Sequence, residues 1–75
     1  MSTSTNQTLS VLICAIDRCL LSAVLHTSEA AAAMNLEKRN LAIGTLLVIE
    51  QDLELVLHLF RATIALHRTM KEGAA

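Results

Sequence analysis

The chain has 75 residues, so it forms one domain at most, and a chain of this length buries only about 60% of its unfolded surface. Apolar residues make up 53% of it, yet Phe60 is its one aromatic residue, and six Lys and Arg balance seven Asp and Glu. This composition argues against nucleic-acid binding, which needs a basic stripe or stacking residues, and favours self-association or a partner chain.

Residues 1–8 are polar and rich in Ser and Thr, and we expect a flexible tail there. Residues 9–33 predict a first helix, because apolar side chains recur at steps of four and three. Leu12 and Val24 widen this stripe, and a weaker strip of Val11, Cys14, Leu21 and Leu25 lies elsewhere on the helix. The stripe consists of Leu9, Ile13, Ile16, Leu20, Ala23, Thr27, Ala30 and Met34.

A turn is predicted at residues 34–36, although no Pro or Gly marks it. Asn35 would cap the following helix, and Glu37 in its first turn would suit the helix dipole. Ser28 and Glu29 offer a second place where one helix could end and another begin. The position of the turn between residues 26 and 36 therefore stays open.

Residues 36–71 predict one long second helix with two apolar seams, roughly 135° apart on a helical wheel. An ordinary surface helix has one such stripe, so this helix is expected to be covered on two sides. The seam predicted to face the first helix is Ala42, Leu46, Ile49, Leu53, Val56, Phe60 and Ile64. The seam predicted to bind a partner chain is Leu41, Val48, Leu55, Leu59, Leu66 and Met70, with Ala62 in phase.

Polar residues fill the remaining wedge of this helix, among them Glu50, Glu54 and His58. A di-iron site needs Glu-x-x-His spacing on faces that point into a bundle, whereas these residues recur every four positions on an outward face. Neither a metal site nor a cofactor is expected. Asp52 lies beside the second seam. It would either fix the register of a partner helix or remain solvated at the edge of the interface. His67 would end the first seam or contact a partner.

Cys14 and Cys19 are five residues apart, which points them to different faces of a helix, so we expect no bridge between them. Reduced, buried thiols are typical of cytosolic proteins. Two helices offer no concave pocket for a nucleophile, and no enzymatic activity is expected. A signal peptide or membrane span is not expected either, because Asp17 and Arg18 interrupt the first apolar run.

The run Thr45-Leu46-Leu47-Val48-Ile49-Glu50-Gln51-Asp52-Leu53-Glu54-Leu55-Val56-Leu57 is similar to the Leu/Ile-rich second helix of one family. It resembles the small co-chaperones of type III secretion needle subunits, including their Ile-Glu-Gln step, and the length and polar start agree. The turn departs from that family, since it carries Ala where polar residues and Pro are commoner. The resemblance implies a bacterial cytoplasmic hairpin that pairs with a second chaperone and keeps the needle subunit soluble.

The sequence therefore predicts an all-α, antiparallel two-helix hairpin, coiled-coil-like, that completes a bundle with another chain. That chain would be a co-chaperone or a secreted subunit, or a second copy in a homodimeric four-helix bundle with a structural or regulatory role. A membrane-surface helix is a third possibility, but its polar face would have to be cationic and here the charges are mixed.

Overall fold

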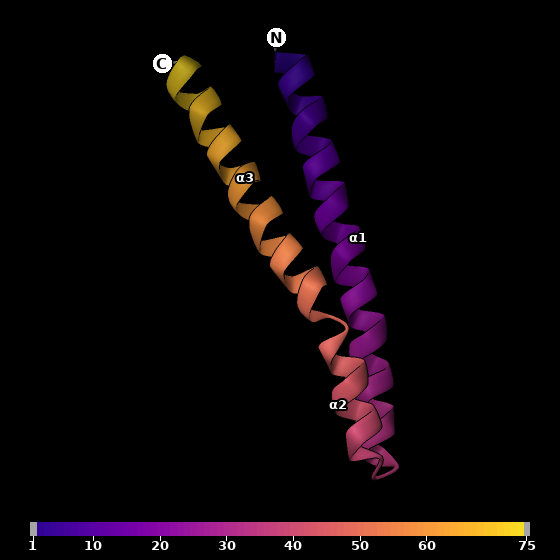
Figure 1. The fold of residues 1–75 in the computed structure, drawn as a ribbon. Helices are drawn as coiled ribbons and strands as arrows, with labels where there is room; N and C mark the ends of the chain where they lie inside the picture. Colours follow the sequence, from indigo (N-terminus) through magenta and orange to yellow (C-terminus); the bar gives the residue numbers. More distant parts are fainter. Residues whose placement is uncertain (1, 75) are drawn as a thin grey trace.

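The computed structural model describes the backbone of residues 2–74 and the side chains of residues 4–69. This part of the chain forms three helices: α1 (Ser2–Asn35), α2 (Arg39–Leu47) and α3 (Glu50–Ala74). Helices α2 and α3 run back along α1, so both ends of the chain lie at the same end of the molecule (Figure 1). The prediction of an all-α helical hairpin is confirmed.

The hairpin is a rod. It measures 56 × 15 × 14 Å and its radius of gyration is 17.1 Å, whereas a compact domain of this length has about 11 Å. Two helices side by side cannot enclose an interior, so the side chains that fill the contact between them are the whole core of this chain.

Helix α1 begins at Ser2 rather than at Leu9, so the prediction of a flexible tail over residues 1–8 is corrected for residues 2–8. Residue 1 lies outside the described residues. The polar start carries neither Pro nor Gly, and Thr8 donates its hydroxyl to the carbonyl oxygen of Ser4 at 3.2 Å, one turn back. Polar composition alone therefore does not stop this helix.

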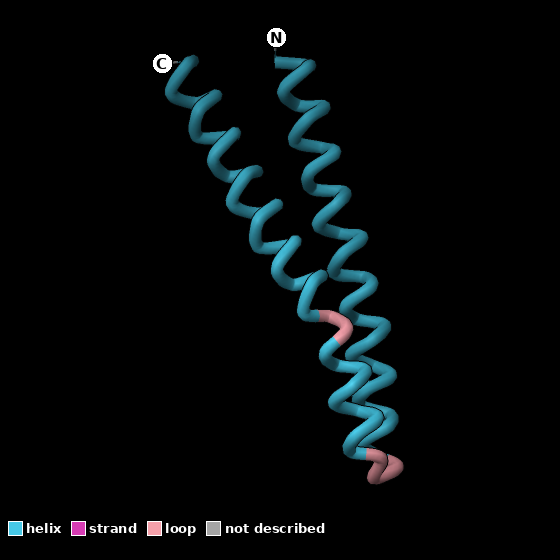
Figure 2. Tube along the Cα trace, viewed as in Figure 1, coloured by secondary structure: helices cyan, strands magenta, loops and turns pink. Residues whose placement is uncertain are grey.

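The turn falls at residues 36–38 rather than 34–36 (Figure 2). The amide of Lys38 donates to the carbonyl of Ala33, and that of Glu37 donates to the carbonyl of Met34, both at 2.9 Å. This pair of hydrogen bonds is a Schellman motif, which needs a left-handed residue at its centre, and Glu37 has φ 61°. Asn35 is the last residue of α1 and caps nothing, so its predicted role as an N-cap is wrong.

Replacing Glu37 with Gly is expected to stabilise the hairpin. A side chain in the left-handed region costs about 1 kcal/mol, and Gly adopts it freely. Part of that gain is lost because Gly also makes the unfolded chain more flexible, so we expect a net gain of roughly 0.5 kcal/mol. Thermal unfolding followed by circular dichroism measures it. Glu37→Ala is the control, and an equal or higher melting temperature for Glu37→Ala would show that φ is not the cause.

The predicted single helix over residues 36–71 is interrupted at Val48 and Ile49, and its last part extends to Ala74. At the interruption the amides of Val48 and Ile49 donate to the carbonyls of Thr45 and Leu46, three residues back, at 3.2 and 3.1 Å. These hydrogen bonds form a 3₁₀-type turn that ends α2. The hydrogen bond from the amide of Leu53 to the carbonyl of Ile49 at 2.9 Å begins the next helix. Val48 and Ile49 are β-branched and therefore weaker helix formers than their neighbours, and the acidic first turn of α3 favours a new start.

One line of side chains from each helix forms the contact, which we call the seam. Its members are all buried or half-buried and recur at alternating steps of three and four, the spacing of a coiled coil. On α1 the seam is Leu9, Leu12, Ile16, Cys19, Ala23, His26, Ala30 and Ala33. On α2 and α3 it is Ala42, Thr45, Ile49, Asp52, Val56, Leu59, Thr63 and Leu66.

The size of the seam residues explains the shape of the hairpin. Near the turn the seam consists mainly of alanines, with Ala30, Ala33 and Ala42 at 6%, 6% and 2% exposure. Small side chains let two helix axes approach closely, and α2 lies directly against α1 (Figure 1). Toward the termini Leu and Ile take over, and α3 diverges from α1 in the same view.

Candidate functional site

The two predicted apolar seams flank the observed seam on opposite sides. Leu46, Leu53 and Phe60 are rotated roughly 70° to one side of it, and Leu41, Val48 and Leu55 roughly 80° to the other. Folding therefore buries the strip between the two predicted seams and leaves much of each exposed. Of the seam predicted to face the first helix, Ala42, Ile49, Val56 and Ile64 are buried or half-buried, whereas Leu46, Leu53 and Phe60 are 41%, 49% and 53% exposed.

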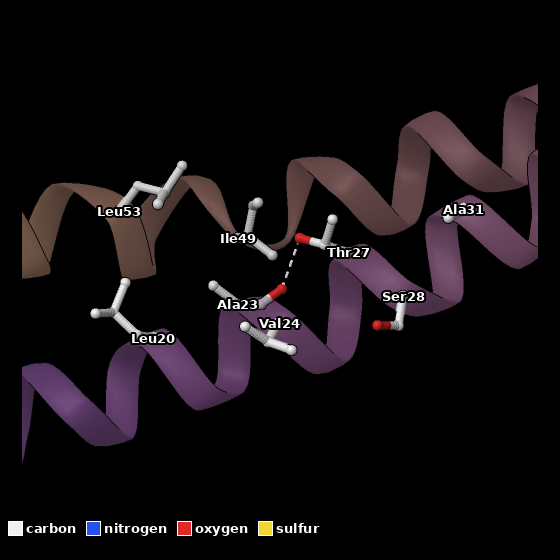
Figure 3. Close-up of a pocket in the computed structure, with 8 residues that line it drawn as sticks. All are labelled: Leu20, Ala23, Val24, Thr27, Ser28, Ala31, Ile49 and Leu53. Carbon is white, nitrogen blue, oxygen red and sulfur yellow. Dashed lines mark hydrogen bonds between the residues drawn. The ribbon is translucent and has the colours of Figure 1, made fainter.

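Leu46 and Leu53 of the first flank line an apolar groove along one side of the hairpin. A hollow of about 350 Å³ lies where α3 leaves α1 (Figure 3), and a second hollow of about 240 Å³ lies nearer the turn. Thr27 and Ala31 line both, so the two hollows are neighbours on the same side of the hairpin. The larger is lined by Leu20, Ala23, Val24, Thr27, Ser28, Ala31, Ile49 and Leu53, and the smaller by Thr27, Ala30, Ala31, Met34, Ala42, Ile43 and Leu46.

The groove offers apolar contact and little else. The Thr27 hydroxyl donates to the carbonyl oxygen of Ala23 at 2.7 Å (Figure 3). Its hydrogen bond is therefore made within α1, and its methyl group remains for packing. Among the described residues, no charged side chain lines either hollow. A surface of this kind recognises another apolar surface by shape and does not orient a small polar substrate.

The opposite flank, which we call the lateral face, consists of Leu41, Val48 and Leu55. These side chains are 57%, 54% and 47% exposed, and their role in partner binding stays a prediction. Leu59 and Leu66, predicted to bind the same partner, are instead half-buried in the seam. The side chain of Met70 lies outside the described residues.

Polar residues also lie within the seam. Thr63 is 8% exposed, and its hydroxyl donates to the carbonyl oxygen of Leu59 at 2.7 Å. The ring nitrogen Nδ1 of His26 donates a hydrogen bond to the carbonyl oxygen of Ser22 at 2.9 Å. Asp52, expected near the partner face, is half-buried between Ile49 and Val56 and faces α1. These residues make the seam less apolar than either of its flanks.

The residues considered for metal binding lie on the surface. Glu50, Glu54 and His58 are exposed, and His67 is exposed beyond Phe60. Within the part of the chain that the structure describes, no group of three His, Cys, Asp or Glu residues gathers at one place. Both cysteines are free; Cys19 lies in the seam, whereas Cys14 is exposed and not buried as expected.

One long apolar segment lies in α1. This segment, Ser4–Asn35, is long and apolar enough to cross a membrane, with a mean hydropathy of 1.9 over the best window. This finding differs from the expectation that no stretch could span a membrane, because the apolar residues around Asp17 and Arg18 outweigh these two charges. Signal sequences and helices inside soluble bundles meet the same criterion. Only 6% of that window is buried, so α1 too has apolar surface that the hairpin does not cover.

Comparison with known proteins finds no family model, no curated protein and no solved structure that matches this chain. The resemblance to secretion co-chaperones therefore rests on the sequence alone, that is, on the 45–57 segment, the length and the polar start. The sequence analysis placed Leu46 and Leu53 in the seam that faces the first helix, and Leu20, Thr27 and Met34 in the main apolar stripe of the first helix. It did not single out Ile43 or Ala31, and their position beside these residues on the helical wheel was the available signal.

Proposed function

We propose that this chain is a protein-binding helical hairpin that packs against helices of another chain. One observation supports the proposal: both flanks of the seam remain apolar and exposed after the hairpin has folded. A helix in a bundle has apolar residues on its contact line and on at least one flank, because it has more than one neighbour. Within the hairpin each helix has one neighbouring helix, so any further neighbours must come from another chain.

The lateral face is the part of this surface that we assign to a different protein. Leu41, Val48 and Leu55 are spaced by seven residues, and Val48 keeps helical dihedral angles at the break (φ −61°, ψ −29°), which favours one row along α2, the break and the start of α3. Such a row fits the apolar stripe of an amphipathic helix. A role as a co-chaperone that shields the helices of a secretion needle subunit is the most specific form of this proposal, and it draws on the sequence resemblance.

Replacing Leu55 with Glu is expected to abolish binding of that partner while the hairpin stays folded. Leu55 is 47% exposed, so the carboxylate stays in water in the free chain and is desolvated only in the complex. Affinity capture from the native cell with mass spectrometry, followed by quantification of the co-purified protein, measures the effect. Gln51→Glu, on the exposed polar wedge, is the matched control.

We expect the wild-type chain and Gln51→Glu to retain the same protein in stoichiometric amount, and Leu55→Glu to lose it. Retention of that protein by Leu55→Glu would contradict the assignment of the lateral face. Failure of the wild-type chain to retain any other protein stoichiometrically would contradict the binding of a different protein, and with it the assignment of the lateral face.

A further inference from the structure

We infer that the groove is occupied by a second copy of this chain, so that two hairpins form a four-helix bundle. This inference rests on the proposed helix-binding function and names the occupant of one of its two flanks. The lateral face lies on the other side of the seam and stays available to a different protein.

The accessible surface of the chain matches what a dimer would bury. The single hairpin exposes 5895 Å² for a mass of 8.1 kDa, whereas a folded monomer of that mass exposes about 4,500 Å². The excess is about 1,400 Å² per chain, so two chains that buried it would bury about 2,800 Å² together. Stable homodimers commonly bury 2,000–5,000 Å². The excess therefore suffices for a permanent interface between two copies.

The width of the groove favours two helices over one as its occupant. Leu20 and Leu53, on its inner walls, are 43% and 49% exposed. Val24 and Ile43, which also line the hollows, are 59% and 49% exposed, and Leu57, which lines neither, is 46% exposed. A single helix seated in the groove would leave Leu57 in water. A second hairpin brings two adjacent helices with the same apolar side, and it can cover Leu57 as well as the groove.

Charge does not oppose this pairing. The formal net charge of the chain is −1, so two copies repel each other little at long range. In the described structure, the residues that line the hollows are apolar apart from Thr27 and Ser28. Two identical apolar walls can meet across a two-fold axis without bringing like charges together.

The test uses the purified full-length chain and light scattering after size exclusion. We expect a mass of twice 8.1 kDa at micromolar concentration. Leu53→Glu should weaken dimerisation by about a hundredfold or more, because it places a carboxylate at the centre of the interface. Leu55→Glu makes the same change on the opposite flank, and it should leave the dimer intact.

Since Leu53→Glu could also reduce folding, a second measurement uses the unaltered protein. In a mixture of isotopically labelled and unlabelled chains, we expect filtered nuclear Overhauser effects between chains from the methyl groups of Met34, Ile43 and Leu53. A monomer at every concentration, or contacts between chains confined to Leu41, Val48 and Leu55, would overturn the inference. A monomer that still captures its partner refutes the dimer alone, whereas a dimer without a captured partner refutes the assignment of the lateral face.

Discussion

Ala30→Leu is expected to lower the melting temperature of the chain by about 10 °C or more. Ala30 is 6% exposed where α1 and α2 approach most closely, next to the equally buried Ala33. Ala30 borders the smaller hollow on one side, but it also lies in the contact with α2, so we expect a larger side chain to push the two helices apart. Overpacking of a core costs about 1–3 kcal/mol, and each kcal/mol shifts the melting temperature of a domain of this size by roughly 4–8 °C.

Thermal unfolding followed by circular dichroism measures this effect, and Ala32→Leu is the matched control. Ala32 is exposed two residues away on the same helix, so its replacement should leave the melting temperature nearly unchanged. If Ala30→Leu has the same melting temperature as the wild-type chain, or if Ala32→Leu lowers the melting temperature more, the helices do not meet along the alanines.

The second large effect is expected for Leu59→Glu, which should cost about 3 kcal/mol and unfold much of the hairpin. Leu59 is half-buried in the seam, where its backbone carbonyl also accepts the hydroxyl of Thr63. The change removes an apolar side chain from the contact between the helices and takes part of the water away from the new carboxylate. The sequence analysis assigned Leu59 and Leu55 to one partner face, where a charge at either position would leave the helices folded.

Helix content and melting temperature of Leu59→Glu, measured beside those of Leu55→Glu, separate these two accounts. We expect helix content to fall for Leu59→Glu and to persist for Leu55→Glu. Equal helix content and equal melting temperatures in the two variants would mean that Leu59 is exposed like Leu55, which contradicts its place in the seam.

The sequence predicted the architecture because long stretches with helical periodicity are hard to misread. It misplaced the turn because Glu37, and not Gly, occupies the left-handed position of the Schellman motif. It missed the break at Val48 and Ile49 because no Pro marks it. The signal there is only that Val48 and Ile49 are themselves weak helix formers. Neither feature interrupts the apolar pattern on which the prediction relied.

The position of the seam was harder to predict for a physical reason. The most apolar rows of the second half of the chain lie on both sides of the contact line, whereas the line itself includes Thr45, Asp52 and Thr63. A rule that seeks the most apolar stripe therefore selects the flanks. The better signal was the shared spacing of the buried alanines, because small residues permit the close approach that places α2 against α1.

The dependence of the melting temperature on protein concentration tests most directly whether association completes this fold. Anything that binds only the folded chain stabilises it by mass action, so the melting temperature of an associating protein rises with its concentration. Over a hundredfold range of concentration we expect a rise of roughly 5 °C or more. A melting temperature that stays constant over that range would mean that the hairpin is stable with its apolar flanks in water, which contradicts the account.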